Sequence, residues 1–268
     1  MRITDAGQVV FAATMIALGV SGLVQRDFAA IWQPVPAGLP AREGLAFFCA
    51  AMTLATGAGL LWRRTAAVAA GFLLVSLLLW LVLFKGRGLW LAPTEAASWE
   101  SCGETAVLVA AAWVLYARFA SAWESRRLGF TTGEAGLRIA RTIYGLALIA
   151  FGIAHFAYVK DTAALVPSWL PSPFAWVYFT GGTYIAAGVA VVVGIQARLA
   201  ATLSALQIGL FTLLVWVPPL ASGSKDASQW SEAVLSWTLT AAAWVVAASY
   251  GDMPWLAIGK RRNPTQAV

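Results

Sequence analysis

The chain of 268 residues is 60% hydrophobic and only 11% charged, and its mean hydropathy is +0.75. A water-soluble domain of this length has too little interior for so much apolar sequence and needs a charged surface, so the composition excludes a soluble globular protein. The formal charge is +6, but the basic residues fall between apolar segments, so membrane topology explains them better than nucleic-acid binding.

Eight apolar segments follow one another along the chain. Each has roughly 17–22 residues, which is enough to cross a hydrocarbon core about 30 Å thick. In chain order they are 8–24, 43–62, 65–84, 98–118, 139–158, 174–194, 199–217 and 230–249. The predicted fold class is therefore an all-α integral membrane protein with eight transmembrane helices, surrounded by membrane lipid.

The first segment, 8–24, has the length of a signal-peptide core, and the small pair Ala29-Ala30 follows it. However, no soluble domain comes next, and a matching segment recurs inside the chain at 142–158. We therefore expect an uncleaved first helix.

An internal repeat is found when each residue is aligned with the residue 131 positions later. Pro36–Pro40 then aligns with Pro167–Pro171, and Trp99 aligns with Trp230. The sequence Ala-Ala-Ala-Trp-Val occurs in both copies, with its tryptophan at Trp113 and at Trp244. Proline and tryptophan matches at one offset are hard to obtain by chance, so they indicate a duplication. The predicted domains are a four-helix repeat at 1–118, a cytoplasmic linker at 119–137 and a second four-helix repeat at 138–268.

The two repeats are expected to form two four-helix bundles that run in the same direction, because each crosses the membrane an even number of times. Very short turns around Arg64 and Arg198 force the flanking helices to be antiparallel neighbours. The two P-x-x-L-P segments restrict the backbone to extended or turn conformations. They are either part of a binding site or connections that follow the membrane surface.

The loop charges predict the orientation. The termini and the connections at or next to 63–64, 119–138 and 195–198 together carry twelve Lys and Arg residues, whereas the other side carries six. The excess of basic residues on cytoplasmic loops places both termini in the cytoplasm. The longer loops 25–42, 85–97, 159–173 and 218–229 then face outward.

Metal and thiol chemistry have little support. Cys49 and Cys102 lie in different apolar segments, without any C-x-x-C motif, and are expected to pack as small apolar side chains; a disulfide between them stays open. His155 is the sole histidine, which excludes a haem with two histidine ligands, and the scattered cysteines give no zinc site. No P-loop, nucleotide fingerprint or catalytic triad is present, so no metal is predicted.

The second repeat has a motif pattern of its own. It contains Gly152-Ile-Ala-His155-Phe156, then Val166-Pro-Ser-Trp-Leu-Pro171, then Thr180-Gly181-Gly182-Thr-Tyr184-Ile-Ala-Ala-Gly188, and it ends at Arg198-Leu-Ala-Ala. This stretch resembles the DoxX/DoxD-like family of four-helix membrane proteins, and the first repeat keeps the layout more loosely. The resemblance implies a protein of the bacterial cytoplasmic (inner) membrane, in some cases a subunit of a quinone-linked oxidoreductase. Family members often carry a glutamate where this chain has Tyr184 and Thr53, so proton-linked chemistry at that position does not carry over.

Ionisable groups at membrane depth are costly, so each is a candidate functional residue. Glu104 and His155 are the catalytic candidates, as an acid and base pair. Six polar groups are expected in the outward half of the membrane: Glu100, Glu104, His155, Thr180, Tyr184 and Glu232. Glu100 and Glu104 are four residues apart and share one helix face. The alternative is structural, because a carboxylate in the first turn of a helix also stabilises the positive end of the helix dipole.

The remaining binding candidates are Trp113 and Trp244, which lie deeper than the other tryptophans and occupy equivalent positions. Most of the fourteen tryptophans fall near predicted interfaces, where aromatic belts are common. We therefore expect most of them to be membrane anchors.

Three functions fit these patterns. The first is a membrane subunit that binds quinone or another hydrophobic small molecule beside an oxidoreductase partner. The second is a membrane-embedded acid/base enzyme that acts on a lipid-like substrate. The third is a purely structural accessory subunit of a larger membrane complex. If there is a site, both repeats are expected to contribute to it.

Overall fold

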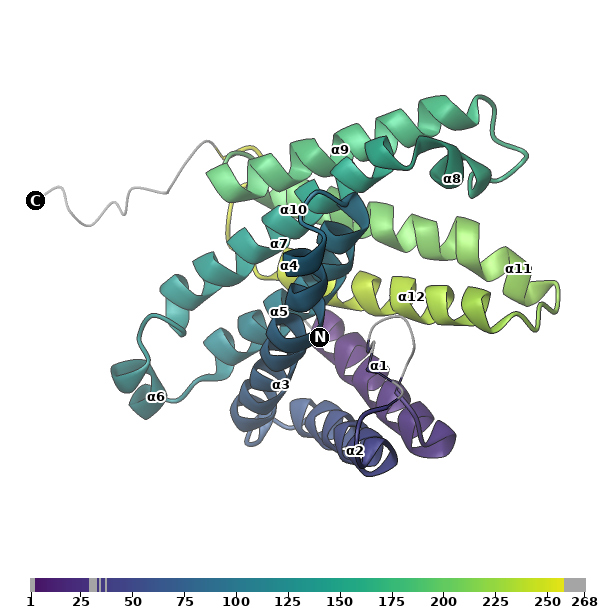
Figure 1. Ribbon diagram of the computed structural model, residues 1–268. Helices are drawn as coiled ribbons and strands as arrows, with labels where there is room; N and C mark the ends of the chain where they lie inside the picture. Colours follow the sequence, from purple (N-terminus) through teal and green to yellow (C-terminus); the bar gives the residue numbers. More distant parts are fainter. Residues whose placement is uncertain (1–2, 29–32, 34, 37, 258–268) are drawn as a thin grey trace, which may run out of the picture.

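The computed structural model confirms an all-α protein that spans a membrane several times (Figure 1). It describes residues 3–28, 33, 35–36 and 38–257. Within these ranges eight helices are long and apolar enough to cross a bilayer, as the sequence predicted. The Ala29-Ala30 pair and the basic residues Arg2, Lys260, Arg261 and Arg262 lie outside the described residues.

The first repeat supplies four spans. They are α1 (Ile3–Gln25), α2 (Arg42–Leu60), α3 (Ala66–Trp80) with its continuation, and α5 (Ala96–Phe119). The third span continues through a π-helical turn, η1 (Leu81–Lys85), into α4 (Gly86–Leu91). A short helix, α6 (Ala122–Arg127), lies in the linker.

The second repeat has the same succession. Its spans are α7 (Gly133–Ala157), α9 (Pro173–Val193), α10 (Ala197–Phe211) with its continuation, and α12 (Ala227–Ala248). A short helix, α8 (Val159–Ala164), joins α7 to α9, and the π-helical turn η2 (Thr212–Trp216) joins α10 to α11 (Val217–Ala221). We call the end of the molecule that holds α8 and α11 the α8 end, and the end that holds α6 the α6 end (Figure 1).

The third and seventh spans are longer than the sequence predicted. The apolar pattern ends at 84 and 217, because a lysine or two prolines follow, but the helices continue to Leu91 and Ala221. Lys85 stays inside the helix because its ammonium group contacts a carboxylate of α5. Pro218 and Pro219 come directly after the π-helical turn η2, in the last turn of the span.

The offset of 131 residues recurs in the local geometry. The turns η1 and η2 occupy equivalent positions. The indole N–H of Trp99 donates to the carbonyl of Pro93 at 2.8 Å, and that of Trp230 donates to the carbonyl of Ser224 at 3.0 Å. These matched details support a duplication of structure as well as of sequence.

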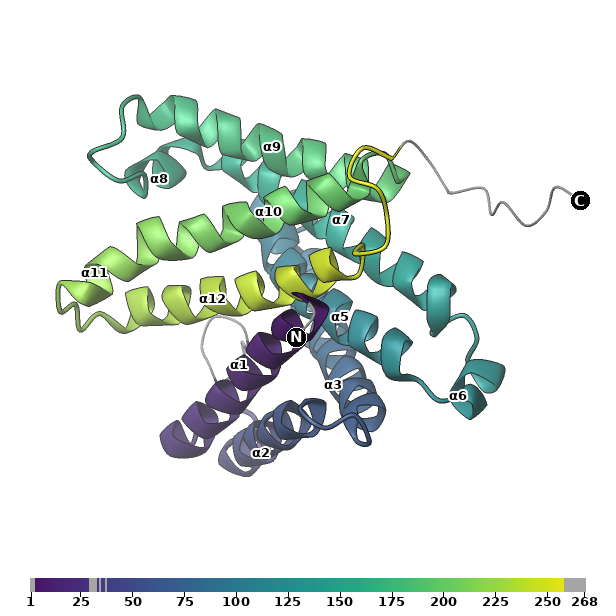
Figure 2. The same ribbon diagram turned by 180° about the vertical axis from the view of Figure 1, so that it is seen from behind.

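The two repeats are interlocked. α5, the fourth helix of the first repeat, packs mainly on α7, the first helix of the second repeat, and also on α3 and α12. In the same way α12 packs on α1 as well as on α10 and α5. Figures 1 and 2 show α5 and α12 meeting in the middle of the molecule. Among the spans described, α5 has the largest share of buried residues.

Lipid contacts the outer faces of the surrounding helices. On α3 the side chains of Phe72, Val75 and Leu79 are all exposed although they are apolar. An exposed apolar surface on a helix of this length and hydropathy fits contact with the hydrocarbon of a bilayer.

Two arginines hold the last described residues against the α6 end. Arg141 donates from Nε to the hydroxyl of Ser249 at 3.0 Å, and its guanidinium lies 4.1 Å from the ring centre of Tyr250. Burial raises the pKa of Tyr250 to about 12, although the nearby guanidinium acts in the opposite direction. Arg198 donates to the carbonyl of Met253 at 2.7 Å and lies 4.0 Å from the ring centre of Trp255. These arginines therefore contribute to tertiary structure as well as to loop charge.

Glycines set the distance between α7 and α9. A Cβ atom at Gly188 would lie 2.5 Å from the carbonyl oxygen of Gly145, and one at Gly152 would lie 2.6 Å from that of Gly181. A glycine also allows close contact between α1 and α2 in the first repeat, where a Cβ at Gly57 would lie 2.8 Å from the backbone nitrogen of Ile16. Small residues let helix backbones approach closely, which maximises dispersion contacts in lipid.

We predict that Gly188→Ala lowers the free energy of unfolding by about 1–3 kcal/mol, because the added methyl group must push α9 away from α7. Gly182→Ala is the matched control, since a Cβ there meets nothing within 4 Å. Thermal unfolding of both variants in one detergent measures the difference. Equal thermal unfolding midpoints for Gly188→Ala and Gly182→Ala would contradict this account of the α7–α9 contact.

Candidate functional site

A cavity of about 1100 Å³ lies within the second repeat and extends to the α8 end. Its walls come from α7, α9, α10 and α12, from the α8 connection, and from the first turns of α5. Most lining side chains are apolar or aromatic, among them Phe151, Phe179 and Phe211. The second repeat therefore encloses space where a helical bundle would normally be filled with side chains.

The cavity is open on its lipid side. Phe179 and Leu206 line it, and their side chains are nevertheless 60% and 57% exposed. Leu210 also lines the cavity and is exposed. These residues belong to α9 and α10, so the opening lies along these two helices and faces hydrocarbon.

Three glutamates and Asp161 of α8 line the cavity. Glu100 and Glu104 belong to the first turns of α5, and Glu232 belongs to those of α12. The first repeat thus contributes two acidic side chains to a cavity of the second, because α5 packs on α7. The sequence placed the three glutamates near the same side of the membrane, and the packing brings them to one cavity.

Glu104 is held by a cation. Its Oε2 lies 3.6 Å from the Nζ of Lys85, which also donates a hydrogen bond of 2.6 Å to the hydroxyl of Ser101. The Lys85 side chain is 3% exposed and that of Glu104 18%. A buried ion pair of this kind fixes the direction of both side chains. Lys85 was not among the expected site residues, although a lysine next to an apolar segment was a possible signal.

His155 is oriented by the backbone of its own helix. Its Nδ1 lies 2.8 Å from the carbonyl oxygen of Phe151, and a carbonyl can only accept, so Nδ1 carries a proton. The imidazole stacks on Phe211 with ring centres 5.9 Å apart and meets Tyr184 edge-on at 5.4 Å. Nε2 is therefore the nitrogen that gains or loses a proton.

A glutamine that was not expected organises the α9–α10 wall. The hydroxyl of Thr183 donates to Oε1 of Gln207 at 2.8 Å, and the amide of Gln207 donates to the carbonyl of Thr180 at 3.1 Å. All three residues line the cavity. An amide inside an apolar span was the available signal, because such groups are costly unless they are hydrogen-bonded.

Six of the eight candidate residues line this one cavity: Glu100, Glu104, His155, Thr180, Tyr184 and Glu232. The other two lie elsewhere. The indole N–H of Trp113 donates to the carbonyl of Thr131 in the linker at 3.0 Å. Trp244 packs against α1, where a Cβ at Gly7 would lie 3.3 Å from its ring. Both tryptophans are nearer the α6 end, where α5 and α12 contact segments away from the cavity.

The fold and the cavity define a multi-pass helical membrane protein with a large, mostly apolar cavity that carries acidic and imidazole groups. A family model described as "Domain of unknown function (DUF8561)" matches residues 144–247. The match covers most of the second repeat and nearly all of the cavity-lining helices α7 to α12. Searches of curated proteins and of solved structures gave no match.

We predict that Lys85→Met destabilises the protein by about 3–5 kcal/mol, because it leaves the Glu104 carboxylate buried without its partner. The double variant Lys85→Met/Glu104→Gln removes the charge as well and should recover most of the loss. Lys160→Met is the control, since Lys160 is exposed. Thermal unfolding in detergent would refute the pairing if the double variant were less stable than the single one.

Proposed function

We propose that this protein binds a hydrophobic small molecule with a polar head group in the cavity of its second repeat, and that the molecule is a quinone. The observation that carries the proposal is the cavity itself. Ligand sites are typically concave, about 300–1000 Å³ in volume and mostly apolar, with a few polar groups that orient the ligand. At about 1100 Å³ the cavity is slightly larger than this range, and its lining is mostly apolar with a few polar groups.

The position of the opening supports entry from the bilayer. A molecule dissolved in lipid would pass between exposed apolar side chains such as Phe179 and Leu206 without entering water. Burial of an apolar tail along α9 and α10 would gain little over lipid, so specificity would depend on the head group. The head group would lie toward the α8 end, near His155 and the carboxylates.

The polar groups suit a head group that exchanges protons. A quinone oxygen accepts a hydrogen bond, and protonated Nε2 of His155 donates one. A quinol loses two protons when it gives up two electrons, and Glu100 and Glu232 are carboxylates on the same walls that could accept protons. The electrons would pass to an oxidoreductase partner, which the resemblance to DoxX/DoxD-like proteins implies. The setting would be the bacterial cytoplasmic membrane, with both termini and the α6 end in the cytoplasm.

A filled cavity tests the proposal. Ala187 lines the cavity on α9, whereas Val189 on the same helix is exposed and outside it. We predict that Ala187→Trp weakens binding of decylubiquinone at least tenfold, which is about 1.4 kcal/mol, whereas Val189→Trp leaves it unchanged. Titrations in lipid nanodiscs, read by native mass spectrometry, measure both. Equal affinities of wild type and Ala187→Trp would reject this cavity as the quinone site.

The acid/base enzyme is the second candidate, because Glu104 and His155 line one cavity. Glu104→Gln should then abolish turnover of a lipid-like substrate while the variant stays folded, and surviving turnover would end that mechanism.

An accessory subunit is the third candidate. Blue-native electrophoresis addresses it, since a protein that migrates alone as a monomer does not fit that role.

A further inference from the structure

A second, much smaller cavity of about 10 Å³ lies in the first repeat. Ten residues line it, and eight of them lie 131 positions before residues that line the large cavity. Thr53 corresponds to Tyr184, Ser76 to Gln207 and Trp80 to Phe211. The two cavities therefore occupy the same place in the two repeats. A space of this size is at the lower limit for a single water molecule.

At two matched positions the first repeat has a larger ring than the second. Trp80 is buried and stacks on Phe84 with ring centres 4.5 Å apart. The residues 131 positions later are Phe211 and Val215, both of which line the open cavity. An indole and a phenyl ring thus stand where the second repeat has a phenyl ring and an isopropyl group, and both rings pack in a cluster with Phe28, Ala46 and Cys49.

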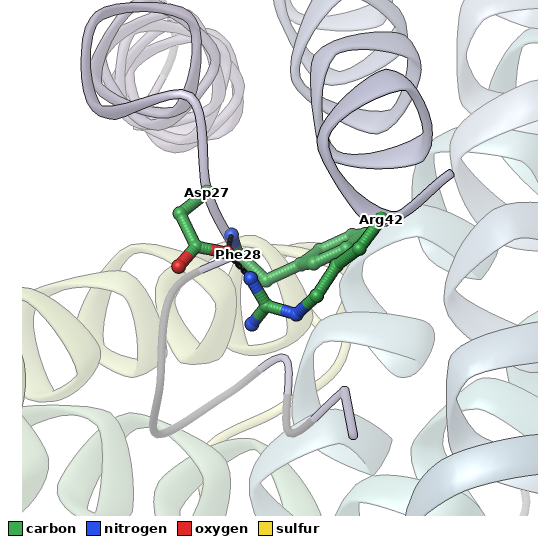
Figure 3. Close-up of polar contacts among 3 residues, drawn as sticks. All are labelled: Asp27, Phe28 and Arg42. Atoms are coloured by element: carbon green, nitrogen blue, oxygen red, sulfur yellow. Dashed lines mark hydrogen bonds and ion pairs between the residues drawn. The ribbon is translucent and has the colours of Figure 1, made fainter. Parts of the chain in front are cut away.

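A third ring, Phe28, packs edge-on against Trp80 at 5.5 Å. Figure 3 shows how it is held: Asp27 accepts a hydrogen bond of 2.6 Å from the backbone N–H of Phe28 and also pairs with Arg42. The guanidinium of Arg42 lies 5.4 Å from the ring centre of Phe28. The residue that corresponds to Arg42 is Pro173, which can make none of these contacts.

We propose that the first repeat contains a closed copy of the ligand cavity, filled by Trp80, Phe84 and Phe28. The chain then binds one molecule, and the closed copy would take the same class of ligand, a hydrophobic molecule such as a quinone, if these rings were reduced. This inference rests on the proposed function for its ligand. The closure itself rests on the aligned cavities and the three rings.

The test replaces the two ring residues of the first repeat with those of the second, as Trp80→Phe/Phe84→Val. Cys49 lines the small cavity and is buried, so it reports opening independently of any quinone. In a Cys102→Ala background, the rate at which N-ethylmaleimide labels Cys49 should rise at least tenfold. The control is Trp62→Phe/Leu79→Val, which removes similar volume at exposed positions outside both cavities.

Native mass spectrometry in nanodiscs then counts bound decylubiquinone. One molecule on the wild type and two on the double variant are expected. Unchanged labelling of Cys49 together with a single bound molecule would overturn the closed-copy proposal. If the wild type binds none but labelling still rises, the proposed function fails and the closed cavity stands.

The reciprocal variant, Phe211→Trp/Val215→Phe, makes the same comparison in the second repeat and keeps the proposal testable if the first variant fails to fold. It should weaken decylubiquinone binding at least tenfold, because it places the first repeat's larger rings in the open cavity. Undiminished binding would overturn the claim that these two positions control closure.

Discussion

The packing of α5 between the two repeats is the contact on which the rest of the structure depends. α5 contacts α3 of its own repeat, α7 of the other, and α12, its own counterpart. In lipid such contacts depend on close dispersion packing, because the surrounding chains are as apolar as the helices themselves. The same contact carries Glu100 and Glu104 across to the second repeat, so a structural interface also supplies two of the acidic groups of the cavity.

The two repeats share one helical scaffold but have different interiors. The helices, the π-helical turns and the tryptophan-to-backbone hydrogen bonds recur at one offset. Side chains at the same positions differ: Lys85 corresponds to Trp216 and Glu104 to Leu235. The first repeat therefore provides the ion pair and a filled core, while the second provides the space. In our proposal this division of roles gives the duplicated chain one ligand site.

Part of the site could be predicted from the sequence. Glu104 and His155 stood out because charged or imidazole groups are rare in apolar spans, and helix periodicity placed Glu100 beside Glu104. Gln207 was missed because it is uncharged, although it hydrogen-bonds across α9 and α10. Trp113 and Trp244 were grouped with the site by their depth alone. Depth does not determine which way a helix face points, and both contact other segments.

The sequence by itself determined the eight membrane helices, since a segment of this length and hydropathy has no stable alternative in lipid. It also indicated the repeat, because Pro and Trp at one offset mark equivalent turns and interfaces. Only the tertiary structure decided that the repeats interlock and that one cavity is open and the other closed. Both outcomes depend on contacts between side chains far apart in the chain, such as Trp80 of α3 against Phe28 of the connection after α1, and no local pattern encodes these contacts.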